Sequence, residues 1–276
     1  MSKRKIADPR KGRISASRLE RVALCPGSFQ AEKGKPDDSS PLAASGTRIH
    51  AALESGDISK LNDDELKQAD RARELREDLT ERFIDDPDEP YKEFTEARYW
   101  ALDDDISGQI DFVLIKDSRA LIIDYKMGFL ESIDAHQNLQ LKAYAVLIKE
   151  NNPEIEEITI AIIQPRVWPE VSQATYSLKH LQMARQEIRG IIEKSQHPEA
   201  RRQPGPVQCN YCKAKADCPE ALSLATSLSK FEGVELPSER LPELLEACSV
   251  AKKIIKAIEA KARNLLELDS AAINGY

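Results

Sequence analysis

The spacing of apolar and polar residues changes near residue 93, where a helical stretch gives way to a strand-rich one. Residues 63–84 carry leucines at helical spacing among many charged side chains, which is typical of an exposed amphipathic helix. Residues 93–102, 107–116 and 120–127 are rich in strand-forming residues, and turn signals built on aspartate separate them. These three segments predict an antiparallel meander.

Helix and strand continue to alternate beyond the meander. Residues 137–149 have the apolar stripe of a helix, and residues 158–163 form an almost wholly apolar run typical of a buried central strand. Residues 178–194 predict a long helix. The order of one helix, three strands, a helix and a strand therefore predicts an α/β fold with a sheet core.

The segments outside this core differ from it in composition. The first 14 residues are strongly basic, a cysteine-rich loop lies at 208–220, and apolar residues at helical spacing follow near 238–268. We predict a flexible tail at 1–14, a main domain at 15–220 and a helical extension at 221–276. The extension could pack on the main domain or on a partner chain.

Composition narrows the class of protein. The chain has 276 residues, of which 41% are hydrophobic and 32% charged, and it contains no apolar run of the roughly 20 residues that span a bilayer. The basic start is followed by no apolar stretch that could act as a signal peptide, so we expect a cytoplasmic protein. Five cysteines in a reducing compartment indicate metal ligation or burial rather than disulfides.

The net charge of −7 does not by itself suggest a nucleic-acid ligand. Basic residues nevertheless gather at the start of the chain and again around Arg185, Arg189 and Arg202. These clusters could contact phosphates, or they could be a flexible tail and a solvated helix face.

Two carboxylates and a lysine form the densest chemical signal. Asp111 and Asp124 both lie inside otherwise apolar strands, where a buried carboxylate needs a cationic partner or a metal. Residues two apart in a strand share a face, so Lys126 lies on the side of Asp124 while Tyr125 points away. Pairing of the strands can bring Asp111 to the same side. Such a set can bind a hard divalent cation and place a lysine beside a phosphate.

These residues resemble the PD-(D/E)XK nuclease superfamily, with Ile110-Asp111 in place of Pro-Asp and Asp124-Tyr125-Lys126 as the second half. Gln140 and Tyr144 resemble the Gln-x-x-x-Tyr motif of its RecB-like branch, and Gly46 to His50 resembles the Gly-x-x-x-His element of that branch. The resemblance covers roughly residues 15–220. It implies a restriction-endonuclease-like core, in which helices flank a mixed central sheet.

The resemblance also implies roles for single residues. Magnesium or manganese would be held by His50, Asp111, Asp124 and the backbone carbonyl of Tyr125, with Lys126 as the catalytic lysine. Glu96, on the strand before Asp111, matches an acid of many relatives. Gln140 and Tyr144, four apart on a helix, would reach the active centre or the DNA backbone.

Each of these residues also has an ordinary structural interpretation. His50 could face solvent, Asp111 and Lys126 could form a structural ion pair, and Gln140 and Tyr144 could be surface residues of a helix. The presence of four elements in the correct order favours the active-site interpretation.

Four of the cysteines predict a second centre. Cys209, Cys212 and Cys218 are closely spaced, and Cys25, far upstream, is the natural fourth ligand. Thiolates suit both zinc and iron–sulfur clusters, so the ligand type leaves both open, and inert thiols are a third possibility. The same arrangement in the iron–sulfur subset of RecB-like and CRISPR-associated exonucleases implies a [4Fe-4S] clasp that closes the domain. Cys248 does not fit this pattern and is expected to be a buried small side chain.

The expected function is that of a metal-dependent DNA exonuclease. The resemblance is to phage-encoded enzymes, which implies end processing for recombination beside a single-strand annealing protein. A non-catalytic DNA-binding or assembly module and a zinc-stabilised scaffold are the alternatives. Some similar phage proteins continue beyond a terminus like Ile273–Tyr276, so a missing C-terminal segment also stays open.

Overall fold

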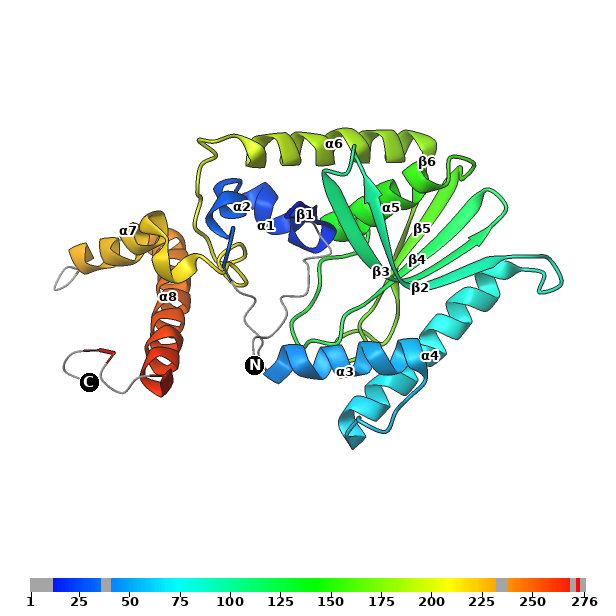
Figure 1. Ribbon diagram of the computed structural model, residues 1–276, viewed down its shortest axis with the longest axis horizontal. Coiled ribbons are helices and arrows are strands. Elements are labelled where there is room, and N and C mark those ends of the chain that lie inside the picture. Colours follow the sequence, from blue (N-terminus) through cyan, green and yellow to red (C-terminus); the bar gives the residue numbers. More distant parts are fainter. Residues whose placement is uncertain (1–11, 36–40, 232–237, 269–271, 274–276) are drawn as a thin grey trace. The chain divides into compact units, whose positions relative to one another are not determined.

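The computed structural model describes residues 12–35, 41–231, 238–268 and 272–273, so most of the basic tail predicted at 1–14 lies outside the described residues. The chain divides into two compact units (Figure 1). The sheet unit comprises Met1–Leu19 and Ser39–Gly190, and the helical unit comprises Glu20–Asp38 and Ile191–Tyr276. The predicted boundaries at 14 and 220 stay a prediction. No helix in the described part of the chain is long and apolar enough to cross a membrane.

A six-stranded mixed sheet forms the centre of the sheet unit, as the α/β prediction required. Its order is β1-β3-β4-β5-β6, and β2 pairs with β3 beside this path. Strands β2, β3 and β4 form the predicted antiparallel meander, whereas β5 runs parallel to β4. The strands are β1 (Ile14–Ser15), β2 (Lys92–Ala101), β3 (Ile106–Lys116), β4 (Arg119–Tyr125), β5 (Glu157–Ile163) and β6 (Ser172–Ser177).

Two of these strands have no counterpart in the predicted elements. Strand β1 is two residues long, too short to show a period. Strand β6 is a polar strand whose side chains are mostly exposed or half-buried, so it lacks an apolar run. Both owe their strand form to pairing with β3 and β5, which propensity alone does not predict.

Helices pack on both faces of this sheet (Figure 1). Helices α3 (Pro41–Ser55) and α4 (Asp63–Ile84) share a core with β3, β4 and β5, in which Ile49, Ala72 and Leu79 meet Phe112 and Ile123. Helix α5 (Leu139–Asn151) lies on the opposite face. It provides the crossover that a parallel β4–β5 pair needs.

Side-chain caps define where helices α4 and α5 begin. At the start of α4, Asn62 accepts from the backbone N–H of Glu65, and Glu65 accepts from the N–H of Asn62, which completes a capping box. At the start of α5, Asn138 accepts from the N–H groups of Gln140 and Leu141. The second cap fixes the register at which Gln140 enters the helix.

The helical unit combines a short segment that interrupts the sheet unit in sequence with the segment that follows it. Helices α7 (Pro219–Ser227) and α8 (Leu241–Leu268) pack together around Ala221, Val250 and Ile254. Cys248 is half-buried, so the expectation that it would be buried is wrong. The remaining helices are η1 (Ala16–Arg18), α1 (Leu19–Leu24), α2 (Gly27–Ala31), α6 (Leu178–Gln196), η2 (Lys215–Asp217), η3 (Leu228–Phe231) and η4 (Ser238–Arg240).

The long helix predicted at 178–194 is α6, and its two arginines have acidic partners within the sheet unit. Arg185 pairs with Glu150 at 2.6 Å, and Arg189 lies 3.6 Å from Asp103. Both arginines remain more than two-fifths exposed. Their contact with phosphates stays a prediction.

Candidate functional site

The ladder between β2 and β3 is interrupted at two acidic residues. Thr95 pairs with Phe112 and Ala97 pairs with Ile110, but Glu96 and Asp111 between them form no regular pair. Glu96 has a φ of 48°, in the left-handed region that costs a non-glycine residue about 1–3 kcal/mol. Two carboxylates opposite each other on antiparallel strands also repel. A cation bound between Glu96 and Asp111 would offset both the backbone strain and the repulsion, so both costs indicate a cation-binding site.

His50 of α3 approaches these two carboxylates. Its Nδ1 atom lies 3.5 Å from Asp111 Oδ1 and 3.6 Å from Glu96 Oε1. The ligand atoms of the three residues all lie within 4.8 Å of one another. The two carboxylates supply the oxygen donors that hard cations such as magnesium and manganese prefer, and the imidazole adds one nitrogen donor. The donor set therefore fits a divalent metal ion.

The pKa of His50 reflects the negative charge of the two nearby carboxylates. Burial would lower the pKa of this imidazole, but the nearby Asp111 and Glu96 carboxylates outweigh burial and raise it to about 10. Without a metal, His50 is thus an imidazolium that partly balances the two acids. Carboxylates that favour a protonated histidine so strongly also attract cations from solution.

A hydrogen-bond relay orients Glu96 from the outer side. Gln109 donates from Nε2 to Glu96 Oε2 at 2.7 Å, and Arg98 donates to Gln109 Oε1 at 3.0 Å. Gln109 was missed in the sequence, although it lies two residues before Asp111 and a strand period of two places it on the same face. On the other side of the site, Asp111 Oδ2 accepts from the backbone N–H of Tyr125 at 2.7 Å.

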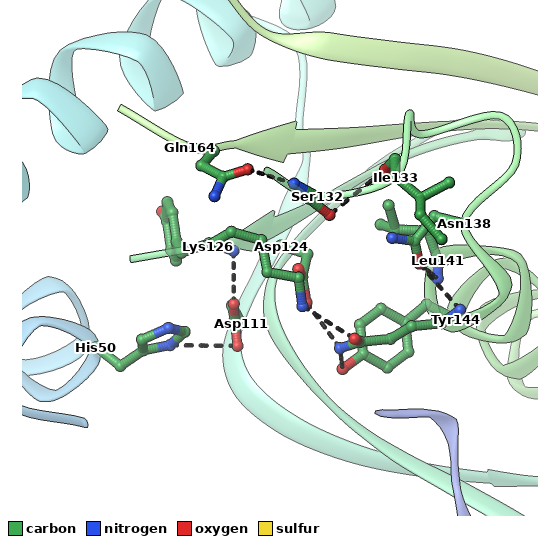
Figure 2. A network of polar contacts seen from close by, with 12 residues as sticks. His50, Asp111, Asp124, Lys126, Ser132, Ile133, Asn138, Leu141, Tyr144 and Gln164 are labelled. Atoms are coloured by element: carbon green, nitrogen blue, oxygen red, sulfur yellow. Dashed lines mark hydrogen bonds and ion pairs between the residues drawn. The ribbon is translucent and has the colours of Figure 1, made fainter. Parts of the chain in front are cut away.

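Beside this set lies a second network around Asp124, Lys126 and Tyr144 (Figure 2), which Gln140 joins together. Lys126 Nζ is 2.7 Å from Asp124 Oδ2 and donates to Gln140 Oε1 at 2.9 Å. Gln140 Nε2 donates to Asp124 Oδ1 at 2.9 Å and to the Tyr144 hydroxyl at 2.7 Å. Tyr144 in turn donates to the carbonyl of Gln109 at 2.8 Å. The lysine is held at two points while 30% of its side chain stays exposed.

Burial dominates the titration of the two enclosed members of this network. It raises the pKa of Asp124 above its ordinary value, against the opposing effect of Lys126. Burial likewise raises the pKa of Tyr144 well above that of a free phenol, and the negative charge of Asp124 adds to the effect. Tyr144 is therefore a neutral hydroxyl that links the helix to β3.

The structure brings the residues named from the sequence into two adjoining groups. His50, Glu96 and Asp111 converge on one point, and Asp124, Lys126, Gln140 and Tyr144 form the network beside it. The carboxylate of Asp124 is engaged by Lys126 and Gln140. The Tyr125 and His50 rings pack in a T-shaped arrangement with their centroids 5.9 Å apart. Ligation by Asp124 and by the Tyr125 carbonyl stays a prediction.

The four cysteines named from the sequence line one hollow of the helical unit. Cys25, Cys209, Cys212 and Cys218 all border it. Backbone N–H groups of Gln203 and Gly205 donate to the sulfurs of Cys25 and Cys209. Burial raises the pKa of Cys212 to about 11, and it raises that of Cys209 and Cys218 as well.

The cysteines do not form a compact group of metal ligands. Among the described residues, no three cysteine sulfurs lie within 4.8 Å of one another. A tetrahedral zinc site with Zn–S bonds of about 2.3 Å would place its sulfurs about 3.8 Å apart. The thiols are thus wider apart than a preformed zinc site requires, and the predicted iron–sulfur cluster stays a prediction.

Comparison with solved structures finds distant likenesses. A protein from Eubacterium rectale described as a candidate exonuclease is 12% identical, with a TM-score of 0.43 over 73% of this chain and 90% of that one. The protein SSO0001 is 16% identical, with a TM-score of 0.37 over 78% of this chain and 89% of that one. LHK-Exo, solved in complex with dAMP, is 12% identical, with a TM-score of 0.27 over 67% and 89%.

A family model gives a closer assignment. The model described as protein of unknown function (DUF2800) matches residues 95–276, which is more than half of the chain and includes Glu96, Asp111, Asp124, Lys126 and Gln140. The chain therefore belongs to the DUF2800 family.

Proposed function

We propose that this protein is a divalent-metal-dependent nuclease that hydrolyses phosphodiester bonds of DNA. The observation that carries the proposal is the convergence of His50, Glu96 and Asp111 directly beside a lysine held in place by Asp124. A structural ion pair needs neither a strained Glu96 nor opposed carboxylates. The motifs resemble those of the RecB-like branch of the PD-(D/E)XK superfamily, and we assign the chain to that branch as part of the proposal.

Each group has a distinct part in this chemistry. Magnesium or manganese held by His50, Glu96 and Asp111 would supply positive charge to the scissile phosphate. Lys126 offers a partly exposed side chain whose ammonium group can orient a water or stabilise the negative charge that develops on the phosphate. Asp124 and Gln140 keep that group aimed, because they bind it from two sides. Pre-orientation of this kind lowers the barrier without a further conformational step.

The proposal is tested with end-labelled linear DNA, with and without magnesium or manganese. Asp111→Asn and Lys126→Ala should each lower the rate of cleavage at least a hundredfold, since each removes a charge next to the phosphate. His50→Ala should cause a smaller loss, because the two carboxylates still hold a metal weakly. Asp117→Asn is the matched control: it removes an acid at the β3–β4 turn, where a φ of 53° suits asparagine, and should leave the rate unchanged.

Two results would contradict this proposal. One is wild-type cleavage that persists in a metal chelator, and the other is a wild-type rate in Asp111→Asn. Comparing linear with covalently closed circular DNA separates exonuclease from endonuclease action, and we propose the former. A role in phage-type recombination beside a single-strand annealing protein rests on the resemblance alone.

We further propose that Cys25, Cys209, Cys212 and Cys218 hold a [4Fe-4S] cluster with a structural role. Their common hollow and the N–H groups aimed at two of the sulfurs support it, since cluster sulfurs are stabilised by such hydrogen bonds. A shared centre would join segments more than 180 residues apart in sequence. By analogy with a disulfide, closing so long a loop contributes roughly 4–5 kcal/mol.

Iron and sulfide analysis of anaerobically purified protein tests the cluster. Serine at any of the four positions should lower bound iron, bleach the brown absorption and reduce the melting temperature. Cys248→Ser is the matched control and should keep full iron, because Cys248 does not border the hollow. Full iron in Cys25→Ser would rule out that ligand, and stoichiometric zinc in the wild type would replace the cluster by a zinc site.

A further inference from the structure

The loop between β4 and α5, residues 126–138, starts at Lys126 and exposes two large apolar side chains. Phe129 is 66% exposed and Leu130 is 70% exposed, which places both among the most exposed large apolar side chains that the structure describes. A loop that was free to rearrange would bury such groups against its own domain, because exposing them is unfavourable. Something must therefore hold them outward.

A buried glutamine provides that restraint. Gln164 lies just after β5 and is 1% exposed, yet its amide is fully engaged by the loop. Its Nε2 donates to the carbonyls of Gly128 at 3.2 Å and Leu130 at 2.7 Å. Its Oε1 accepts from the N–H of Ser132 at 2.9 Å, a bond that Figure 2 shows. Three bonds to the backbone on both sides of Phe129 and Leu130 fix the loop in its outward form.

An arginine supports the Phe129 ring from one side. The guanidinium of Arg166 lies 4.6 Å from the ring centroid, which is a cation–π arrangement. Arg166 is itself fixed by Asp64, to which it donates twice, and by the carbonyl of Met127. Its side chain is only 9% exposed. The ring is thus backed by a rigid cation while most of its own surface stays open to solvent.

We propose that Phe129 and Leu130 form a stacking platform for an unpaired base of the DNA strand that is cut at this site. The proposal rests on the proposed nuclease function and deepens it, because it names the state of the substrate: a strand whose end is single-stranded or frayed. Aromatic side chains recognise unpaired bases by stacking, with little dependence on sequence. Phe129 is three residues from Lys126, so the Cα atoms of the two residues lie at most about 11 Å apart. A strand whose phosphate lies at Lys126 therefore passes close to this loop, where an unpaired base could contact the ring.

The first arm of the test measures cleavage. Wild type and Phe129→Ala are compared on oligonucleotides that carry either a base or an abasic sugar next to the cleaved bond. Wild type should prefer the base by about 5- to 150-fold, the range that corresponds to loss of one stacked base. Phe129→Ala should show no preference, whereas Phe129→Trp should restore it. Tyr91→Ala is the matched control, because Tyr91 is an exposed aromatic residue at the start of β2, where Lys92 pairs with Ile115 near the opposite end of β3 and β4.

The second arm measures binding in a metal chelator, where no cleavage occurs. A single strand with 2-aminopurine at its end should lose fluorescence on binding to wild type, because stacking quenches the base, and should lose less on binding to Phe129→Ala. Quenching without cleavage under any metal condition would support the stacking platform and refute the proposed nuclease function. Cleavage with equal quenching and equal base preference in both proteins would overturn the platform and leave the nuclease function standing. Neither binding nor cleavage would remove both.

Discussion

Replacing Gln140 by leucine removes the amide that joins Lys126, Asp124 and Tyr144 while nearly preserving the size of the side chain. Three hydrogen bonds are lost, two donated and one accepted. Asp124 and Tyr144 are 2% and 3% exposed, so water cannot replace the lost donor at either group. At about 1 kcal/mol net per bond, the expected loss of stability is about 3 kcal/mol. For a unit of this size, that lowers the melting temperature by roughly 6–12 °C.

Gln140→Glu gives a sharper version of the same experiment. The glutamate keeps an acceptor for Lys126 but places a carboxylate where the amide donated to Asp124. Two buried carboxylates at hydrogen-bond distance cannot both ionise without cost, so this variant should be less stable than Gln140→Leu at pH 8. Acidification to about pH 5.5 should restore part of its stability, because one proton shared by the pair lets one carboxyl donate to the other.

The assay is thermal unfolding of metal-free protein at both pH values, followed by single-turnover cleavage of labelled DNA. Gln140 holds Lys126 and Asp124 in place beside the site, so the cleavage rate should fall in both variants. Gln173→Glu, an exposed residue of β6, is the matched control and should change neither quantity. Wild-type stability of Gln140→Glu at pH 8 would refute the network.

Two further predictions concern stability. In Gly108→Ala the new Cβ would lie 2.7 Å from side-chain atoms of Leu147 and Tyr144, so overpacking should lower the free energy of unfolding by about 1–3 kcal/mol, measured by thermal unfolding. Gly46→Ala in α3 is the control, because its Cβ would meet nothing within 4 Å and should not destabilise the protein. An unchanged stability of Gly108→Ala would contradict this prediction. Hydrogen bonds from Arg48 and Ser45 lower the pKa of Glu65 from 4.5 to about 2, so its contribution is present above pH 4.5 and is lost as the pH falls towards 2. Urea unfolding across this range should lose that slope in Glu65→Gln.

Much of the sheet unit follows from local periodicity in the sequence. The meander β2–β3–β4, the buried strand β5 and the helices α4, α5 and α6 all lie close to the segments that predict them. The pairing of Asp124 with Lys126 also follows from the sequence, because a strand period of two is a property of the backbone. The helical spacing of Gln140 and Tyr144 likewise predicts their shared face.

Other features of the site depend on packing between distant segments. His50 is near Asp111 only because α3 docks on the face of β3 and β4, and Glu96 faces it only because its backbone adopts a left-handed φ that no propensity favours. The hydrogen bond from Gln164 to the Leu130 carbonyl and the one from Gln109 to Glu96 also depend on tertiary packing, because each joins groups on different strands or loops.

The sequence by itself thus determined which elements form and which charged residues share a face, because both depend on bonds and periods within a few residues. Only the tertiary structure decided that His50, Glu96 and Asp111 converge, that four cysteines from both ends of the chain border one hollow, and that Phe129 stays exposed. These distances depend on how buried surfaces fit together over the whole unit, and no local pattern in the sequence encodes that fit.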